Sequence, residues 1–170
     1  AVIAQTLTDA KEIFRTKIKF PYDNLPVVLR ELIRPESDSV DVLKLSNGSQ
    51  IRVGTSLRSS TSHRLHITEH GKICAQEPIK AREIRTGALN TIQPGQRIDI
   101  ESTANGREGD FYDFCTLARN HQRSGKKLTS MDFKFHFYPW WRDAKYTLKG
   151  DIVIDETMDT YFDKLKNEHN

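Results

Sequence analysis

Only two of the 170 residues are cysteines, Cys74 and Cys115. They have neither the spacing of paired metal ligands nor the number that a disulfide framework needs, so we expect reduced thiols, as in cytosolic proteins. No apolar run approaches the roughly 20 residues that cross a bilayer, and we expect no membrane partner. The net charge of +3 permits an anionic partner, but a dedicated nucleic-acid module usually carries a denser basic stripe.

The sequence also lacks the phosphate-binding pattern Gly-x-x-x-x-Gly-Lys-Ser/Thr. Its two Gly-Lys pairs, at 71–72 and 125–126, lack both the earlier glycine and the hydroxyl residue. Because the phosphates then have no cradle, we expect this chain alone to bind nucleotide poorly or not at all. The chain opens directly on an apolar stretch at 1–7. We therefore expect it to be a piece of a longer protein, truncated at its N-terminus.

Apolar periodicity predicts an alternation of strands and helices. The predicted strands cover residues 1–7, 41–45, 50–55, 64–69, 97–101 and 132–137. The predicted helices cover residues 10–20, 24–33, 78–91, 111–122 and 156–170. Such alternation is typical of an α/β fold with a mostly parallel sheet and flanking helices.

Local signals set several predicted boundaries. Asn47-Gly48 between two apolar runs predicts a β-hairpin. Thr8 or Asp9 is expected to cap the first helix, and Pro21 is expected to end it.

The first candidate site lies in Arg-Leu-His-Ile-Thr-Glu-His-Gly, residues 64–71. Leu65 and Ile67 predict a buried strand, and Glu69 follows at its carboxyl end, where ligands of open α/β sheets collect. Glu69 is a candidate general base that orients or activates a water for attack on a phosphoryl group. A surface glutamate at a strand end would give the same pattern. Thr68 is a candidate for weak magnesium ligation, directly or through a water.

A second group of polar residues, Ser102-Thr103-Ala104-Asn105, follows the predicted strand at 97–101. Its hydroxyl and amide groups could sense a γ-phosphate and pass the change to neighbouring elements. A capped turn leading into the next helix fits these residue types equally well.

Two further interpretations remain open. Asp99 and Glu101 share one strand face and, with Glu69, could form a metal-dependent nuclease cluster. Arg58, in a Ser/Thr-rich loop, could contact a phosphate in the same or a neighbouring subunit, although such an arginine is more often solvated.

The adjacent tryptophans, Trp140-Trp141, fit a core or a domain-contact surface better than a base-stacking platform. Together with nearby basic residues, they nevertheless leave open a non-catalytic α/β module that docks on DNA or protein.

Several segments together resemble the large terminase subunit of tailed bacteriophages and prophages, the ATP-driven motor that packages DNA into procapsids. The resemblance rests on five segments in this order: Leu-Arg-Ser-Ser-Thr at 57–61, Arg-Leu-His-Ile-Thr-Glu-His-Gly-Lys-Ile-Cys at 64–74, Glu-Ile-Arg-Thr-Gly-Ala at 83–88, Glu-Ser-Thr-Ala-Asn-Gly-Arg-Glu-Gly at 101–109 and Phe-Tyr-Pro-Trp-Trp at 137–141.

The resemblance implies a RecA-like fold of the ASCE P-loop NTPase type. Residues 1–150 would be the later part of the ATPase domain, without the Walker A segment, and residues 151–170 a linker helix towards a nuclease domain. Glu69 matches the catalytic glutamate after the Walker B strand, and Thr68 stands where many relatives have the Asp that holds magnesium. Ser102, Thr103 and Ala104 match the coupling motif, directly before Asn105.

The same resemblance implies ATP and Mg²⁺ as cofactors of the full-length protein, with neither expected on this piece. It implies double-stranded DNA, the portal protein and the small terminase subunit as partners, in the host bacterial cytoplasm at the procapsid portal. A missing central strand would leave a sheet edge exposed, so we also expect self-association.

Overall fold

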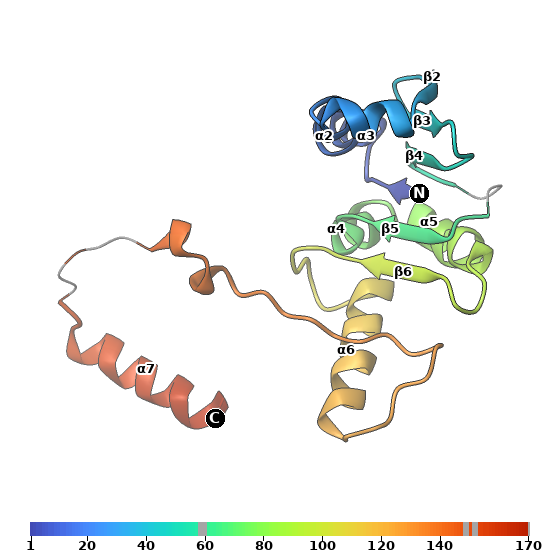
Figure 1. Ribbon diagram of the computed structural model, residues 1–170. Helices are drawn as coiled ribbons and strands as arrows, with labels where there is room; N and C mark the ends of the chain where they lie inside the picture. The colour runs from blue at the N-terminus through green and yellow to red at the C-terminus, as the bar shows by residue number, and fades with distance from the viewer. Residues whose placement is uncertain (58–60, 148–149, 151–152, 170) are drawn as a thin grey trace. The chain divides into compact units, whose positions relative to one another are not determined.

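The structure is a computed structural model that describes residues 1–57, 61–147, 150 and 153–169. The chain divides into two compact units, Ala1–Phe135 and His136–Asn170. The first unit contains the sheet, and the second contains two short helical turns and the helix α7 (Glu156–His169) (Figure 1). The predicted boundary between residues 150 and 151 stays a prediction.

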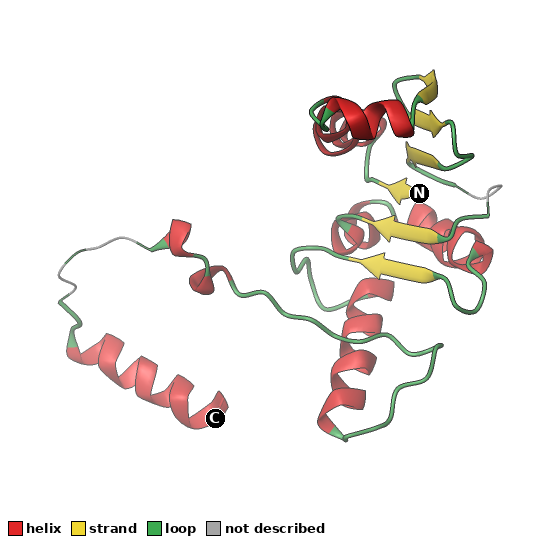
Figure 2. Cartoon of the chain, in the orientation of Figure 1, coloured by secondary structure: helices red, strands yellow, loops and turns green. Residues whose placement is uncertain are grey.

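A six-stranded mixed sheet forms the centre of the first unit (Figure 2). Its strands are β1 (Val2–Ile3), β2 (Pro35–Asp38), β3 (Val42–Leu45), β4 (Gln50–Gly54), β5 (Arg64–Ile67) and β6 (Arg97–Ile100). Their order is β2-β3-β4-β1-β5-β6. β1 is parallel to both β4 and β5, and β5 is parallel to β6. β2, β3 and β4 pair antiparallel. The α/β fold with flanking helices is thereby confirmed.

The first unit also contains helices, some of which pack on the two faces of the sheet. They are α1 (Leu7–Ile13), η1 (Phe14–Lys19, π-helical), α2 (Phe20–Asp23), α3 (Val27–Leu32), α4 (His70–Gln76), α5 (Pro78–Glu83), η2 (Ile84–Ala88, π-helical), η3 (Leu89–Thr91) and α6 (Gly109–Arg123). Because successive strand residues point to opposite faces, Ile3 and Ala4 belong to different cores.

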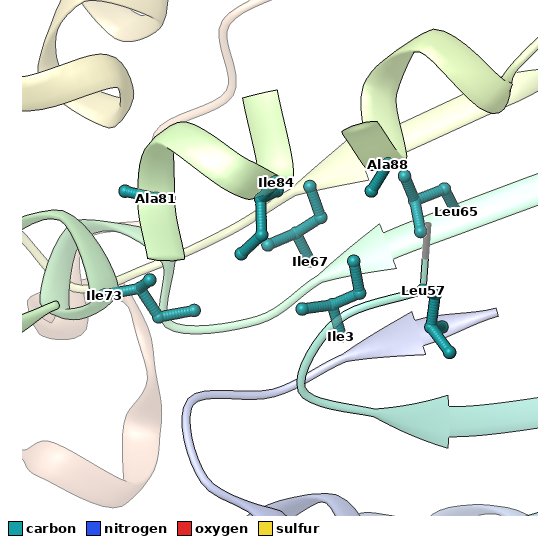
Figure 3. Packing of buried hydrophobic residues seen from close by; sticks show 8 residues of the cluster. All are labelled: Ile3, Leu57, Leu65, Ile67, Ile73, Ala81, Ile84 and Ala88. Atoms are coloured by element: carbon teal, nitrogen blue, oxygen red, sulfur yellow. The ribbon is translucent and has the colours of Figure 1, made fainter. Parts of the chain in front are cut away.

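The larger core lies between β1, β5 and the helices α4, α5 and η2. Its buried members are Ile3, Leu57, Leu65, Ile67, Ile73, Ala81, Ile84 and Ala88 (Figure 3). The second core lies on the opposite face, beneath α1 and η1, and contains Ala4, Ala10, Phe14, Leu43 and Val53. Full burial of a side chain such as Ile67 stabilises the fold by about 1.5–3 kcal/mol.

The first helix begins earlier and continues further than predicted. Its N-cap is Thr6, not Thr8 or Asp9, because Asp9 serves at the third helical position: its carboxylate accepts from Thr6 while its N–H bonds back to the Thr6 hydroxyl. Pro21 does not end the helix. It lies in the first turn of α2, where a missing N–H costs least.

The hairpin prediction is confirmed, with Gly48 at φ 80° between β3 and β4. The strand predicted at 132–137 is wrong, because these residues form no strand. Phe133 instead packs on Phe114 of α6 with ring centroids 5.3 Å apart, and the Phe135 N–H donates to Gln122 Oε1. The alternating phenylalanines therefore do not reflect strand pairing.

The second unit contains η4 (Trp140–Arg142), η5 (Ala144–Tyr146) and α7 (Glu156–His169). Trp140 packs edge-on against both Trp141 and Tyr146. Both tryptophans are exposed, at 64% and 57%, which excludes the predicted core position. The alternative, a domain-contact surface, stays a prediction. Within the described residues, no helix is long and apolar enough to cross a membrane.

Candidate functional site

The site is built where the parallel strands β1, β5 and β6 end together. Directly before Glu69, the Thr68 N–H donates to Ile3 O of β1 at 3.0 Å. Directly after it, the His70 N–H donates to Glu101 O at 3.2 Å. Glu69 is thus held from both sides at the carboxyl edge of the sheet, the usual ligand edge of open α/β folds.

The backbone of Glu69 is left-handed, with φ 54° and ψ 35°. It is the single non-glycine residue with positive φ in the part of the chain that the structure describes. β5 passes into α4 with almost no spacer, and this conformation makes the sharp turn, at a cost of about 1–2 kcal/mol. Strained backbone of this kind clusters at functional sites.

Glu69 is half-buried, and its carboxylate has no hydrogen bond or ion pair to another described residue. A hollow of about 240 Å³ lies beside it, lined by Ala4, Gln5, Asp9, Glu12, Ile13, Thr68 and Glu69. The other two acids in the lining are engaged. Asp9 accepts from the Thr6 hydroxyl at 2.7 Å, and Glu12 pairs with Arg15 at 2.7 Å. Glu69 is therefore the carboxylate of this lining that has no partner among the described residues.

Thr68 lines the same hollow as Glu69, and the sequence predicted both. The carboxylate of Glu69 is a ligand type that Mg²⁺ prefers, whereas the hydroxyl of Thr68 would be a weak ligand. The Thr68 hydroxyl also bonds to Glu101. Hydrogen bonding from His66, whose Nε2 lies 3.5 Å from Glu101 Oε1, and from Thr68 holds the pKa of Glu101 below its usual range against partial burial.

The nuclease interpretation is not supported by the position of Asp99. Its carboxylate lies 2.7 Å from Arg97 and 3.0 Å from Arg64. Partial burial opposes ionisation, but the bonds from these arginines outweigh it and lower the pKa of Asp99. Among the residues described, no group of three or more His, Cys, Asp or Glu side chains could hold a metal ion.

The segment from Ser102 to Asn105 connects β6 to α6, and its first part lies against α4. A Cβ at Gly71 would lie 3.0 Å from Ser102 Oγ and 3.1 Å from both Thr103 O and Phe111 Cδ1. Gly71 therefore permits the close approach of α4 to this segment. Thr103, Ala104 and Asn105 are exposed.

His70, which was not among the residues predicted for the site, is fully buried. Within the described residues neither ring nitrogen has a hydrogen-bond partner, and Ser102 Oγ is likewise buried without one. The His70 ring packs edge-on against Phe111, with centroids 6.4 Å apart. Burial lowers the pKa of His70, and nearby Asp110 offsets this only in part. A polar residue between Glu69 and a tightly packed glycine carried no sequence signal of burial.

No known protein family and no curated protein matches this chain. The candidate site therefore rests on its geometry. Arg58, the phosphate-contact candidate, lies outside the described residues.

The burial of His70 predicts acid sensitivity. An unfolded histidine gains its proton near pH 6.5, whereas the folded chain keeps His70 neutral to lower pH. Below about pH 6.5 the unfolded state binds more protons than the folded state. The free energy of unfolding is therefore fully retained above pH 6.5 and decreases as the pH falls, by at most about 1.4 kcal/mol per pH unit. Urea unfolding at pH 7.5 and 5.5 measures this, with His70→Leu as the comparison. Equal losses in both proteins would contradict the prediction.

Proposed function

We propose that the chain is the later part of the ATPase domain of a large-terminase-type motor that packages double-stranded DNA. The observation that carries the proposal is the position of Glu69: a carboxylate without a partner among the described residues, at the carboxyl end of a parallel strand and on left-handed backbone. In this role Glu69 orients the attacking water and accepts its proton.

The sheet offers a place for the missing half of the nucleotide site. In the described part of the chain β6 is the last strand of the sheet. The Glu101 N–H donates to Ile67 O of β5, and the Arg97 N–H donates to His63 O, directly before β5. The N–H groups of Ile98 and Ile100 therefore point to the outer edge. A further parallel strand beside β6 would end at the same edge as Glu69, as a RecA-like sheet with a phosphate loop requires. The same edge is the surface through which we expect self-association.

Two of the described residues could contribute to a Mg²⁺ site. Thr68 and Glu69 would suit a Mg²⁺ held largely through water. Bound ATP and Mg²⁺ would supply the phosphoryl group and the charge that neutralises it. The Ser102–Asn105 segment would respond to that site and pass its state to α6. Within the larger motor, the proposed partners are DNA, the portal protein and the small terminase subunit, at the procapsid portal in the host cytoplasm.

The test compares this chain with a longer version that includes the proposed upstream phosphate loop. We expect only the longer version to bind a fluorescent ATP analogue and to release phosphate from ATP. ATP binding by the short chain would mean that it has a phosphate cradle of its own. If neither version bound or hydrolysed ATP, the ATPase proposal would be overturned.

The exposed Trp140 and Trp141 favour a second candidate, a module that docks on DNA or protein. Binding of DNA by the short chain should then weaken steeply with salt, because phosphate contacts release counterions. DNA binding that is absent or indifferent to salt would count against DNA docking.

A further inference from the structure

Three unfavourable features occur together where β5 passes into α4. Glu69 is left-handed, the buried ring of His70 has no hydrogen-bond partner among the described residues, and the same is true of the buried Ser102 Oγ. A buried polar group without a partner is destabilising, and such groups are rare in folded proteins. Strained backbone likewise persists only where the surrounding structure imposes it, often at switch regions.

The two segments that carry these features lie against each other. The His70 N–H bonds to Glu101 O, one residue before Ser102. Gly71 approaches Ser102 and Thr103 so closely that even a Cβ would be crowded. Phe111, in the first turn of α6, touches both sides of this contact: the His70 ring packs on it, and a Cβ at Gly71 would lie 3.1 Å from it. These contacts connect the turn at Glu69 and His70 to Ser102 and to the first turn of α6.

We propose that His70 and Ser102 form a two-position latch, in which His70 is a positioning residue. In the second position Glu69 leaves the left-handed conformation, and the Ser102 hydroxyl donates a hydrogen bond to a ring nitrogen of His70. A neutral imidazole has one nitrogen that accepts, so both unpaired groups gain a partner in one bond. The free energy gained from this hydrogen bond offsets the packing contacts that are lost in the second arrangement. The two arrangements therefore have similar free energies.

The idea that the latch links ATP hydrolysis to movement of α6 rests on the proposed function. The ends of the latch are the candidate base, Glu69, and the first turn of α6, with Gly71 as the close contact between them. The latch itself is a property of the chain described here and is tested on it without ATP.

The experiment measures NMR relaxation dispersion of backbone amides in the chain as it stands. We expect one shared exchange process at Glu69, His70, Ser102 and Phe111. His70→Leu and Ser102→Ala should each abolish it while leaving the fold at least as stable, because each removes a buried unpaired polar group. His70→Asn should retain the exchange, because its amide oxygen can accept from Ser102.

Flat dispersion at these amides in the unchanged chain would overturn the latch, as would exchange that survives both His70→Leu and Ser102→Ala. Should one of these two variants fail to fold, the other decides. Failure of the proposed function is a separate result: the longer version would then lack ATP hydrolysis whatever the dispersion. If both hold, Ser102→Ala in the longer version should reduce DNA movement more than ATP turnover.

Discussion

Glutamine in place of Glu69 is expected to slow ATP hydrolysis by about 10²–10⁴-fold in the longer version of the chain, the usual contribution of a general base. The amide cannot accept the proton of the attacking water. Glutamine has the size and stereochemistry of glutamate, so it keeps the left-handed backbone strain and the lining of the hollow nearly unchanged. ATP affinity should therefore be retained. Steady-state phosphate release, beside binding of a labelled ATP analogue, measures both quantities.

The matched control is Glu12→Gln. Glu12 lines the same hollow, but its carboxylate is paired with Arg15. Glu12→Gln removes one negative charge from the hollow but leaves the unpaired carboxylate of Glu69 in place. ATP turnover should therefore stay within a few-fold of the unchanged protein. Near-normal hydrolysis by Glu69→Gln would refute the role of Glu69. Equal losses in both variants would point to the charge of the hollow in place of proton transfer.

Alanine in place of Gly109 should give the largest loss of stability among the glycine variants. Gly109 begins α6 with φ 82°, a conformation that costs a residue with a side chain about 1–2 kcal/mol. Its added Cβ would also lie 2.9 Å from the Cβ of Cys74 in α4. Forcing these two helices apart should cost about 1–3 kcal/mol more. Urea unfolding followed by circular dichroism measures the sum.

Gly125→Ala separates the two contributions. Gly125 follows the other end of α6 with φ 68°, but nothing lies within 4 Å of a Cβ built there. It should lose only the conformational part of the free energy of unfolding. If both variants lost the same amount, the contact between α4 and α6 would be loose enough to absorb a methyl group, contrary to the packing described here.

Short-range signals in the sequence predicted much of the sheet. Asn47-Gly48 located the hairpin because its turn requires positive φ, and the apolar pair Leu65 and Ile67 located β5 because both side chains are buried. The strand predicted at 132–137 was wrong because alternation records which side chains are apolar, not what covers them. The helix α4 was missed because it follows Glu69 without the usual spacer or capping residue.

The sequence also predicted Glu69, Thr68 and Ser102 as residues at neighbouring strand ends. It could not predict the hollow, because Asp9 and Glu12 reach it from a helix on the other side of β1. Nor could it predict that His70 is buried without a partner or that Gly71 admits Ser102. Both features depend on the close packing of α4 against α6. The residue types alone do not predict which atoms of two helices approach to within about 3 Å.

The π-helical turn η1 has a geometric consequence for the second core. Besides Ile13, four residues of this continuous helical stretch pack in the second core, and they recur at every fourth position: Ala10, Phe14, Ile18 and Tyr22. In an ideal α-helix each such step rotates the side chain by about 40°, so three steps would carry the last one about 120° around the axis. A π-helical turn holds more residues and rotates the stripe back. The wider turn thus offsets the rotation of the ideal α-helix. Apolar side chains at every fourth position can then stay on the helix face that packs on β1, β3 and β4.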